Sequence, residues 1–258
     1  MSRAALLAPI CALVLLLAGC GQAPGLDRLA PGESGRVADI RSGDTLVLDS
    51  GLTVRLAGVE APKGGDPYAA EARTALRRLV DGRMVRLLYG GARRDAYGRA
   101  LAQVKLAHGG LWVQGALLRT GAVRMRTWAD NRAMAGVMLE DEAWARNRKK
   151  GLWALPVYKV LVPWETGPVF GFQIVEGRVR RTGPTADGSS LDFAEDPGQG
   201  FTAEIPTNAV AAFKTAGKAP DQLRGRLVRV RGPFRPGYDG PVMRLDHPEQ
   251  VELLKEKD

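Results

Sequence analysis

The sequence of 258 residues contains only two cysteines, Cys11 and Cys20, and both lie near its beginning. It also contains only two histidines. His108 stands beside two glycines, where a turn is expected, and His247 precedes a proline, where a loop cap is expected. We expect neither histidine to bind a metal. If Cys11 is removed with a signal segment and Cys20 is lipidated, as described next, no thiol remains for disulfide partners or a metal, so the core must provide the stability of the fold.

Long apolar runs are also scarce. The longest, Ala4 to Ala18, spans about 15 residues after the single positive charge of Arg3, which is short for a bilayer span but typical of a secretory signal. It ends in Leu-Ala-Gly-Cys, which resembles the bacterial lipoprotein signal. The resemblance implies a signal peptide at 1–19, lipidation of Cys20 and a lipid-anchored, extracytoplasmic location in the cell envelope. An uncleaved membrane anchor is the alternative.

Residues 20–35 are rich in glycine and proline and are predicted to form a tether between the lipid and the folded protein.

The charge is unevenly distributed. The formal net charge is +9, yet residues 158–258 contain 14 of the 37 Lys and Arg and 14 of the 28 Asp and Glu, so they are neutral. The whole excess lies in residues 1–157. A basic surface favours polyanions such as nucleic acids, but it also suits an anionic membrane, so charge alone does not choose between these partners.

Hydrophobic periodicity predicts a mainly β protein with some α-helix. Alternating apolar residues indicate strands at 36–49, 52–56, 83–89 and 101–106, whereas helical stripes indicate helices at 67–79, 112–119 and 133–148. Strands with helices inserted late suggest a five-stranded barrel of the oligonucleotide/oligosaccharide-binding (OB) type. We assign this domain to residues 36–157.

Four charged residues stand in short motifs along this domain: Asp44 in Ser-Gly-Asp-Thr, Arg55 in Val-Arg-Leu, Glu60 in Gly-Val-Glu-Ala-Pro-Lys and Arg99 in Asp-Ala-Tyr-Gly-Arg. Their order and approximate spacing resemble the active site of the thermonuclease (micrococcal-nuclease-like) family. The helices that follow, with Gly121 between them, are similar to that family in order as well.

The resemblance implies a Ca²⁺-dependent endonuclease acting on DNA and RNA. Asp44 and Glu60 would bind the metal with the backbone carbonyl of Ala61, since carboxylate and carbonyl oxygens suit Ca²⁺. Arg55 and Arg99 would be the catalytic phosphate clamps, because a planar guanidinium binds two phosphate oxygens at once. By the same resemblance, Tyr97 would contact a substrate phosphate.

The sequence departs from the family pattern at the general base, where Lys63 replaces the usual glutamate. A lysine ammonium cannot accept a proton from water at neutral pH. Asp66 is the possible substitute base, or else Lys63 adds a phosphate contact to a site that does not cut. Ser42 and Ala96 replace a further acid and a lysine, and the usual stacking tyrosine corresponds to Thr127, next to Trp128.

Prolines between about 154 and 169 mark a boundary, after which residues 158–258 are predicted to form a second OB-like domain. Its expected strands are 170–179, 191–193, 201–205, 227–230 and 251–254, with a helix near 208–216. Basic and aromatic residues there could hold single-stranded nucleic acid: Arg178, Arg180, Arg229, Arg231, Phe234 and Tyr238. Because this half is neutral, a solvated face with aromatics closing the barrel end is the preferred reading.

The sequence therefore predicts an α+β protein of two OB-like five-stranded barrels, the first with thermonuclease-type helices. Its expected activity is metal-dependent hydrolysis of DNA or RNA. The alternative is a catalytically inactive lipoprotein that keeps the barrel to bind nucleic acid or an envelope component.

Overall fold

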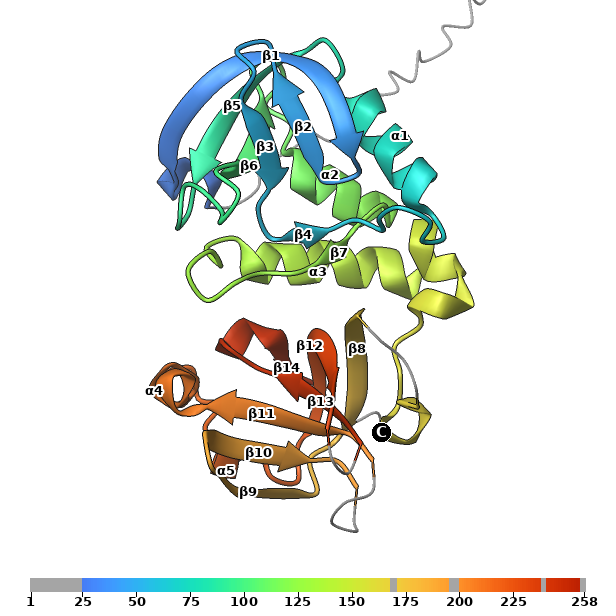
Figure 1. Cartoon of the computed structure of the whole chain (residues 1–258), viewed down its shortest axis with the longest axis vertical. Coiled ribbons are helices and arrows are strands. Elements are labelled where there is room, and N and C mark those ends of the chain that lie inside the picture. Colours follow the sequence, from blue (N-terminus) through green and yellow to red (C-terminus); the bar gives the residue numbers. More distant parts are fainter. Residues whose placement is uncertain (1–24, 168–170, 195–199, 238–239, 256–258) are drawn as a thin grey trace, which may run out of the picture.

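The computed structural model describes residues 25–167, 171–194, 200–237 and 240–255. Figure 1 shows an N-terminal barrel above a second β-sheet, with helix α3 (Ala135–Asn147) between them. The predicted signal segment 1–19 and the predicted lipidation site Cys20 lie outside the described residues. No helix of the described residues is both long and apolar enough to cross a membrane.

The barrel consists of five strands in the closed order β1-β2-β3-β6-β5. The strands are β1 (Ala30–Ser42), β2 (Thr45–Leu48), β3 (Thr53–Leu56), β5 (Met84–Tyr89) and β6 (Ala100–Leu106). Strands β3 and β6 are parallel and the other neighbours are antiparallel. Inward-facing apolar side chains such as Leu46, Val54, Leu87 and Val104 are fully buried. The predicted mixed fold with a closed five-stranded barrel is confirmed.

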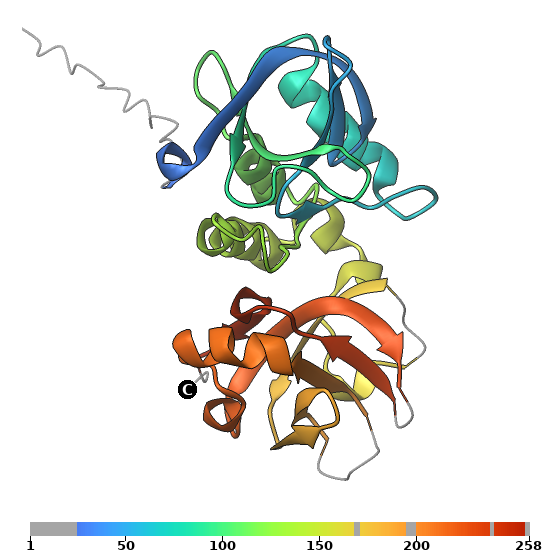
Figure 2. The ribbon, with the colours of Figure 1, turned by 60° about the vertical axis from the view of Figure 1, so that its left-hand side comes forward.

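Three helices support the barrel where the sequence predicts them. These are α1 (Ala69–Val80), α2 (Val113–Thr120) and α3. The α1 stripe Ala72, Leu76 and Val80 is buried, and α1 lies against the outside of the barrel in Figures 1 and 2. Helix α2 ends at Gly121 in the left-handed region, where an added Cβ would come within 2.1 Å of the Lys150 carbonyl oxygen.

The stretch expected as a tether, residues 20–35, is part of the fold from Leu26 onward. Leu26 is buried in the core, and residues from Ala30 pair with β5 as part of β1. Gly32 lies directly over the ring of Tyr89, where a Cβ would meet the ring at 2.3 Å. Gly32 therefore allows close packing within a strand, whereas the composition suggested a flexible tether.

The second sheet has seven strands instead of the five expected. They are β8 (Gly171–Arg178), β9 (Arg181–Thr185), β10 (Gly188–Asp192), β11 (Thr202–Pro206), β12 (Leu227–Pro236), β13 (Pro241–Arg244) and β14 (Val251–Leu253). Helices α4 (Thr207–Thr215) and α5 (Pro220–Leu223) follow β11. The predicted last strand 251–254 is present as β14, whereas β9 and β13 were not predicted, and β13 pairs in parallel with β11. The sequence did not predict β13 because this strand is short and glycine and proline precede it, so no apolar run marks it.

The pairing in the second sheet repeats much of the order of the first barrel. Strand β12 pairs with β8 and β13, while β11 pairs with β10 and β13. Strands β8 and β9 together take the place of the long β1, since β8 pairs with β12 and β9 with β10. Within the described residues, the sheet order is β14-β12-β13-β11-β10-β9, and β8 pairs with β12 beside this path.

Candidate active site

Asp44 lies in the turn between β1 and β2 and is fully buried. The turn packs tightly on α1, because a Cβ on Gly43 would lie 2.7 Å from that of Ala72. Asp44 Oδ1 accepts hydrogen bonds from Ser42 Oγ at 2.8 Å and Thr45 Oγ1 at 3.0 Å, and Oδ2 accepts one from the Ala61 N–H at 2.9 Å. Burial opposes ionisation, but Arg55 and these donors hold the pKa of the carboxyl below its ordinary value.

Arg55 lies on β3 and is also buried, with 3% of its surface exposed. Its Nη1 is 3.2 Å from Asp44 Oδ2 and donates to the Leu56 carbonyl at 3.0 Å, while Nη2 is 3.4 Å from Glu60 Oε2. Burial lowers the pKa of Arg55, and the two carboxylates oppose that change. A guanidinium remains protonated in proteins, so Arg55 is a fixed positive charge at the base of the site.

Glu60 lies on the short strand β4 (Val59–Glu60), which pairs with β7 (Arg124–Met125). This pairing places Arg126, just after β7, with its Nη1 3.0 Å from Glu60 Oε2. Arg126 was not predicted from the sequence. Its guanidinium lies 5.4 Å from the ring centre of Trp128 and 5.5 Å from that of Phe172 on β8. Cation–π contacts at these distances help to fix the position of the Arg126 side chain.

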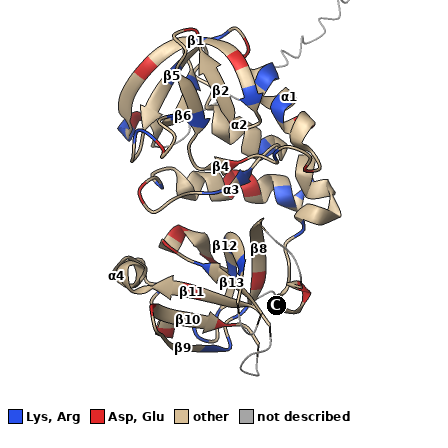
Figure 3. Ribbon diagram, viewed as in Figure 1, with Lys and Arg blue, Asp and Glu red and all other residues tan. Residues whose placement is uncertain are grey.

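Lys63 lies between the two carboxylates. Its Nζ is 3.9 Å from Asp44 Oδ2 and 3.9 Å from Glu60 Oε1, and half of its side-chain surface is exposed. We refer to Asp44, Arg55, Glu60, Lys63 and Arg126 as the charged cluster. It contains two acidic and three basic side chains, and Figure 3 shows acidic and basic segments meeting near β4 and α3.

Asp66, predicted as a possible substitute base, belongs to the loop that carries Lys63. Its Oδ2 accepts a hydrogen bond from the Lys63 backbone N–H at 3.0 Å, and its own N–H donates to the Lys63 carbonyl at 2.9 Å. This carboxylate closes the loop on itself. Its role as a base stays a prediction, and the contacts in the structure do not favour it.

Arg99 lies in the loop before β6 and is held by Asp95. Both Nε and Nη2 of Arg99 are 2.7 Å from Asp95 Oδ2. Burial disfavours the Asp95 carboxylate, but the hydrogen bonds from Arg99 and the Tyr97 N–H lower its pKa below the ordinary value. The guanidinium lies 5.3 Å from the Tyr97 ring, which is 85% exposed.

Arg55 and Arg99 line the same groove. The groove has a volume of about 340 Å³ and is also lined by Tyr97, Trp128 and Asp130. The structure therefore brings together the two predicted phosphate clamps and the predicted phosphate contact Tyr97. Trp128 lies 5.9 Å from the Arg55 guanidinium, so an aromatic ring is present beside Thr127 as the sequence suggested.

The charged cluster does not fit a resident Ca²⁺. No group of three or more acidic, histidine or cysteine side chains converges among the described residues. Asp44 Oδ1 already accepts two hydrogen bonds, Oδ2 accepts one and pairs with Arg55, and Glu60 faces three cations. A calcium site needs six to eight oxygen ligands, with negative charge to balance the ion. The assignment of Asp44, Glu60 and the Ala61 carbonyl as metal ligands stays a prediction.

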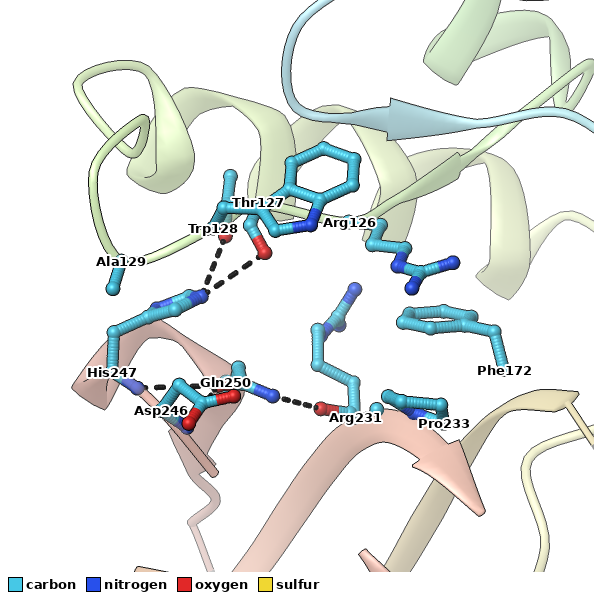
Figure 4. Close-up of a pocket in the computed structure, with 11 residues that line it drawn as sticks. Arg126, Thr127, Trp128, Ala129, Phe172, Arg231, Pro233, Asp246, His247 and Gln250 are labelled. Atoms are coloured by element: carbon cyan, nitrogen blue, oxygen red, sulfur yellow. Dashed lines mark hydrogen bonds between the residues drawn. The ribbon is translucent and has the colours of Figure 1, made fainter. Parts of the chain in front are cut away.

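A second, smaller pocket lies between residues 126–129 and the second sheet (Figure 4). His247 Nε2 lies 3.1 Å from the Thr127 carbonyl, and Gln250 donates to the Arg231 carbonyl at 2.9 Å. As expected, His247 stands at a cap position, before the short helix Pro248–Gln250, and its buried ring also contacts residues before α3. The contact between His247 and Thr127 joins residues that are 120 positions apart, so sequence spacing could not predict it.

The expected solvated basic face of the second sheet is absent at two of its arginines. Arg231 is 1% exposed and binds Glu142 of α3, while Arg229 binds Glu176 and Glu252. Phe234 is buried in the core, and Arg178 donates to the Gly225 carbonyl. Tyr238 lies outside the described residues. Arg229 and Arg231 therefore form ion pairs within the protein rather than an exposed nucleic-acid surface.

Comparison with known proteins agrees with this geometry. Residues 53–155 match the family model described as staphylococcal nuclease homologue. This segment contains Arg55, Glu60, Lys63 and Arg99, and Asp44 precedes it.

Among curated proteins, the "Probable staphylococcal-like nuclease CAN1" of Oryza sativa subsp. japonica is 31% identical over 119 residues, which cover 46% of this chain and 33% of the relative. The "Staphylococcal-like nuclease CAN1" of Arabidopsis thaliana is 31% identical over 42% of this chain and 31% of the relative. The "Thermonuclease" of Staphylococcus hyicus is 27% identical over 46% of this chain and 75% of the relative. The match thus spans about a third of the length of these plant relatives. Residues 53–155 form a staphylococcal-nuclease-like domain.

Proposed function

We propose that this protein is a nuclease-like protein that binds the phosphodiester backbone of DNA or RNA and hydrolyses it. The observation that carries the proposal is the groove in which Arg55 and Arg99 lie together beside Trp128. Guanidinium groups suit a phosphodiester because they stay charged and present paired donors to two oxygens. The excess positive charge of residues 1–157 supports a polyanionic substrate.

Each groove residue has a distinct part in binding. Arg55, fixed by Asp44 and Glu60, provides a charge that cannot move away from the phosphate. Arg99 is held at the rim by Asp95, and the exposed Tyr97 ring lies over it. Trp128 offers a flat ring on which a base can stack, as in many proteins that bind single strands.

Hydrolysis also requires a group that accepts a proton from the attacking water. Lys63 cannot do so, and Asp66 is bound to its own loop. Glu60 Oε2 binds Arg55 and Arg126, whereas Oε1 accepts none of the hydrogen bonds found among the described residues and lies 3.9 Å from Lys63 Nζ. Oε1 of Glu60 is therefore the proposed proton acceptor.

Calcium dependence is implied by the family resemblance alone. Since the charged cluster does not fit a resident Ca²⁺, no step of the proposed function passes through the ion.

A second candidate function is binding without hydrolysis. The observation in its favour is Lys63, a cation in the position where the resemblance expects a general base. A protein of this kind would use the same groove to retain nucleic acid at the cell envelope.

A cleavage assay with the purified full-length protein separates these candidates. Substrates are single-stranded DNA, duplex DNA and RNA, each with Ca²⁺ or with a chelator, and the variants are Arg99→Ala and Glu60→Gln. Hydrolysis requires that the native protein cuts and that Glu60→Gln binds an oligonucleotide but does not cut it. Binding without cutting by the native protein supports the second candidate, and the absence of both refutes the proposal.

We further propose that the protein is anchored at the extracytoplasmic side of the envelope through lipidated Cys20. The Leu-Ala-Gly-Cys sequence after a short apolar run supports this location. Fractionation of cells that express the native chain or Cys20→Ser tests it. The native protein is expected in the membrane fraction, with Cys20→Ser unprocessed at this site. A native protein without lipid by mass spectrometry contradicts the proposal.

A further inference from the structure

The Lys63 ammonium lies between the two carboxylates that the resemblance assigns to a metal. Its Nζ is equally far, 3.9 Å, from Asp44 Oδ2 and from Glu60 Oε1. One cationic group thus lies between one oxygen of each predicted ligand. A divalent ion that bound both oxygens would have to displace the ammonium, because Ca²⁺ lies about 2.3–2.6 Å from its oxygen ligands.

The charge of the cluster leads to the same conclusion. With Asp44 and Glu60 ionised, the three basic side chains Arg55, Lys63 and Arg126 leave a net charge of +1. A phosphodiester carries a single negative charge, so the cluster can neutralise one without help from an ion. Adding Ca²⁺ would raise the charge to +3 and place the ion beside an ammonium.

We propose that Lys63 takes the place of the divalent cation, so that the site binds the phosphodiester of nucleic acids without a metal. This inference rests on the proposed function. Lys63 is suited to the task because half of its side-chain surface is exposed, so its ammonium can contact a phosphate oxygen while the carboxylates hold it from behind. Buried Arg55 contacts both carboxylates, and Arg126 contacts Glu60, so neither carboxylate depends on Lys63 alone for its position.

Replacing Lys63 with glutamate should make binding depend on a metal. Lys63→Glu changes the charge of the cluster from +1 to −1 and adds oxygen ligands to Asp44 and Glu60. One bound Ca²⁺ then returns the charge to +1. Lys63→Glu is therefore expected to require the metal that the native protein does not require. Lys214→Glu, an exposed lysine on α4, is the matched control because it makes the same change in net charge away from the groove.

The test measures binding of a labelled single-stranded oligonucleotide by fluorescence anisotropy, at constant ionic strength, with Ca²⁺ or with EDTA. The native protein and Lys214→Glu are each expected to bind equally well, within about twofold, in the two conditions. Lys63→Glu is expected to lose about tenfold or more in affinity in EDTA, equivalent to about 1.4 kcal/mol, and to regain it in Ca²⁺. Ca²⁺ alone should raise the melting temperature of Lys63→Glu but not that of the native protein.

Three outcomes would overturn one or both proposals. Native binding that is lost in EDTA refutes the replacement of the metal but leaves the proposed function intact. Native binding that is equal in both conditions but unchanged in Lys63→Glu refutes the role of Lys63. The absence of oligonucleotide binding in either condition, by a protein that melts cooperatively, refutes the proposed function and with it this inference.

Discussion

Arg231 of β12 donates from Nη1 to Glu142 Oε2 of α3 at 2.8 Å, and both side chains are almost completely buried. Glu142 also accepts hydrogen bonds from the Met125 N–H and from Arg146. One carboxylate therefore joins strand β7, helix α3 and the second sheet. Within Arg231, Nε has no hydrogen-bond partner among the described residues, so the side chain depends on its ion pairs.

Replacing Arg231 is expected to destabilise the whole protein. Arg231→Ala leaves Glu142 and Glu252 with less compensation in a buried setting, and breaking such a pair costs about 3–5 kcal/mol. Urea unfolding monitored by circular dichroism measures the loss. Arg235→Ala, on the same strand but with an exposed side chain, should change the free energy of unfolding by less than about 0.5 kcal/mol. Equal effects of the two substitutions would show that the buried ion pairs do not stabilise the fold.

Gly32 tests whether residues 30–35 belong to the barrel. A Cβ there would lie 2.3 Å from a ring carbon of Tyr89, so Gly32→Ala is expected to cost about 1–3 kcal/mol through overpacking. Gly136, on α3, has no atom within 4 Å of an added Cβ, and Gly136→Ala should stabilise the protein by about 0.5–1 kcal/mol. Thermal unfolding compares them. A neutral Gly32→Ala would support a tether instead.

Arg99 should contribute one phosphate contact to nucleic-acid binding. For single strands, the logarithm of the binding constant falls with the logarithm of salt concentration by about 0.7 for each neutralised phosphate. Arg99→Ala is therefore expected to weaken binding and to make this slope about 0.7 less steep. Titrations at several salt concentrations measure it, with the exposed Arg224→Ala as the control. An unchanged slope in Arg99→Ala would place the phosphate elsewhere.

Glu249 should make stability depend on pH in the acid range. Burial alone would raise its pKa, but hydrogen bonds with His247 and Arg132 lower the pKa from its ordinary 4.5 to about 2. A carboxyl with a lowered pKa in the folded protein stabilises it above the unfolded pKa. This stabilisation is lost as the pH falls from about 4.5 toward 2.

The matched experiment compares melting temperatures of the native protein and Glu249→Gln between pH 7 and pH 3. The variant should be less stable at pH 7 and should lose less stability on acidification. Parallel curves for the two proteins would mean that Glu249 titrates normally in the folded state.

The sequence allowed the first barrel and its helices to be predicted because their signals are local. The apolar stripe Ala72, Leu76 and Val80 gives a helix whatever lies around it, and Asp44, Arg55 and Glu60 stand in recognisable short motifs. The groove with Arg55 and Arg99 followed from the family resemblance.

Other features depend on contacts between distant segments. Arg126 reaches Glu60 only because β4 and β7 pair across 66 residues of sequence. Arg231 follows the alternation of an ordinary strand, and its burial is decided by α3 on the opposite side. The glycines and prolines of residues 30–35 were misread because a packing requirement, such as that of Tyr89 over Gly32, gives the same composition as a flexible linker.

The contact between Arg126 and Phe172 links the second sheet to the charged cluster. The Arg126 guanidinium lies 5.5 Å from the Phe172 ring and 3.0 Å from Glu60 Oε2. A hybrid protein that joined this barrel to the C-terminal region of another protein would therefore need an aromatic side chain at the corresponding position. Without an aromatic side chain there, the barrel would keep all the residues of its own groove. Arg126 would nevertheless be less firmly positioned, and so would Glu60, which it contacts.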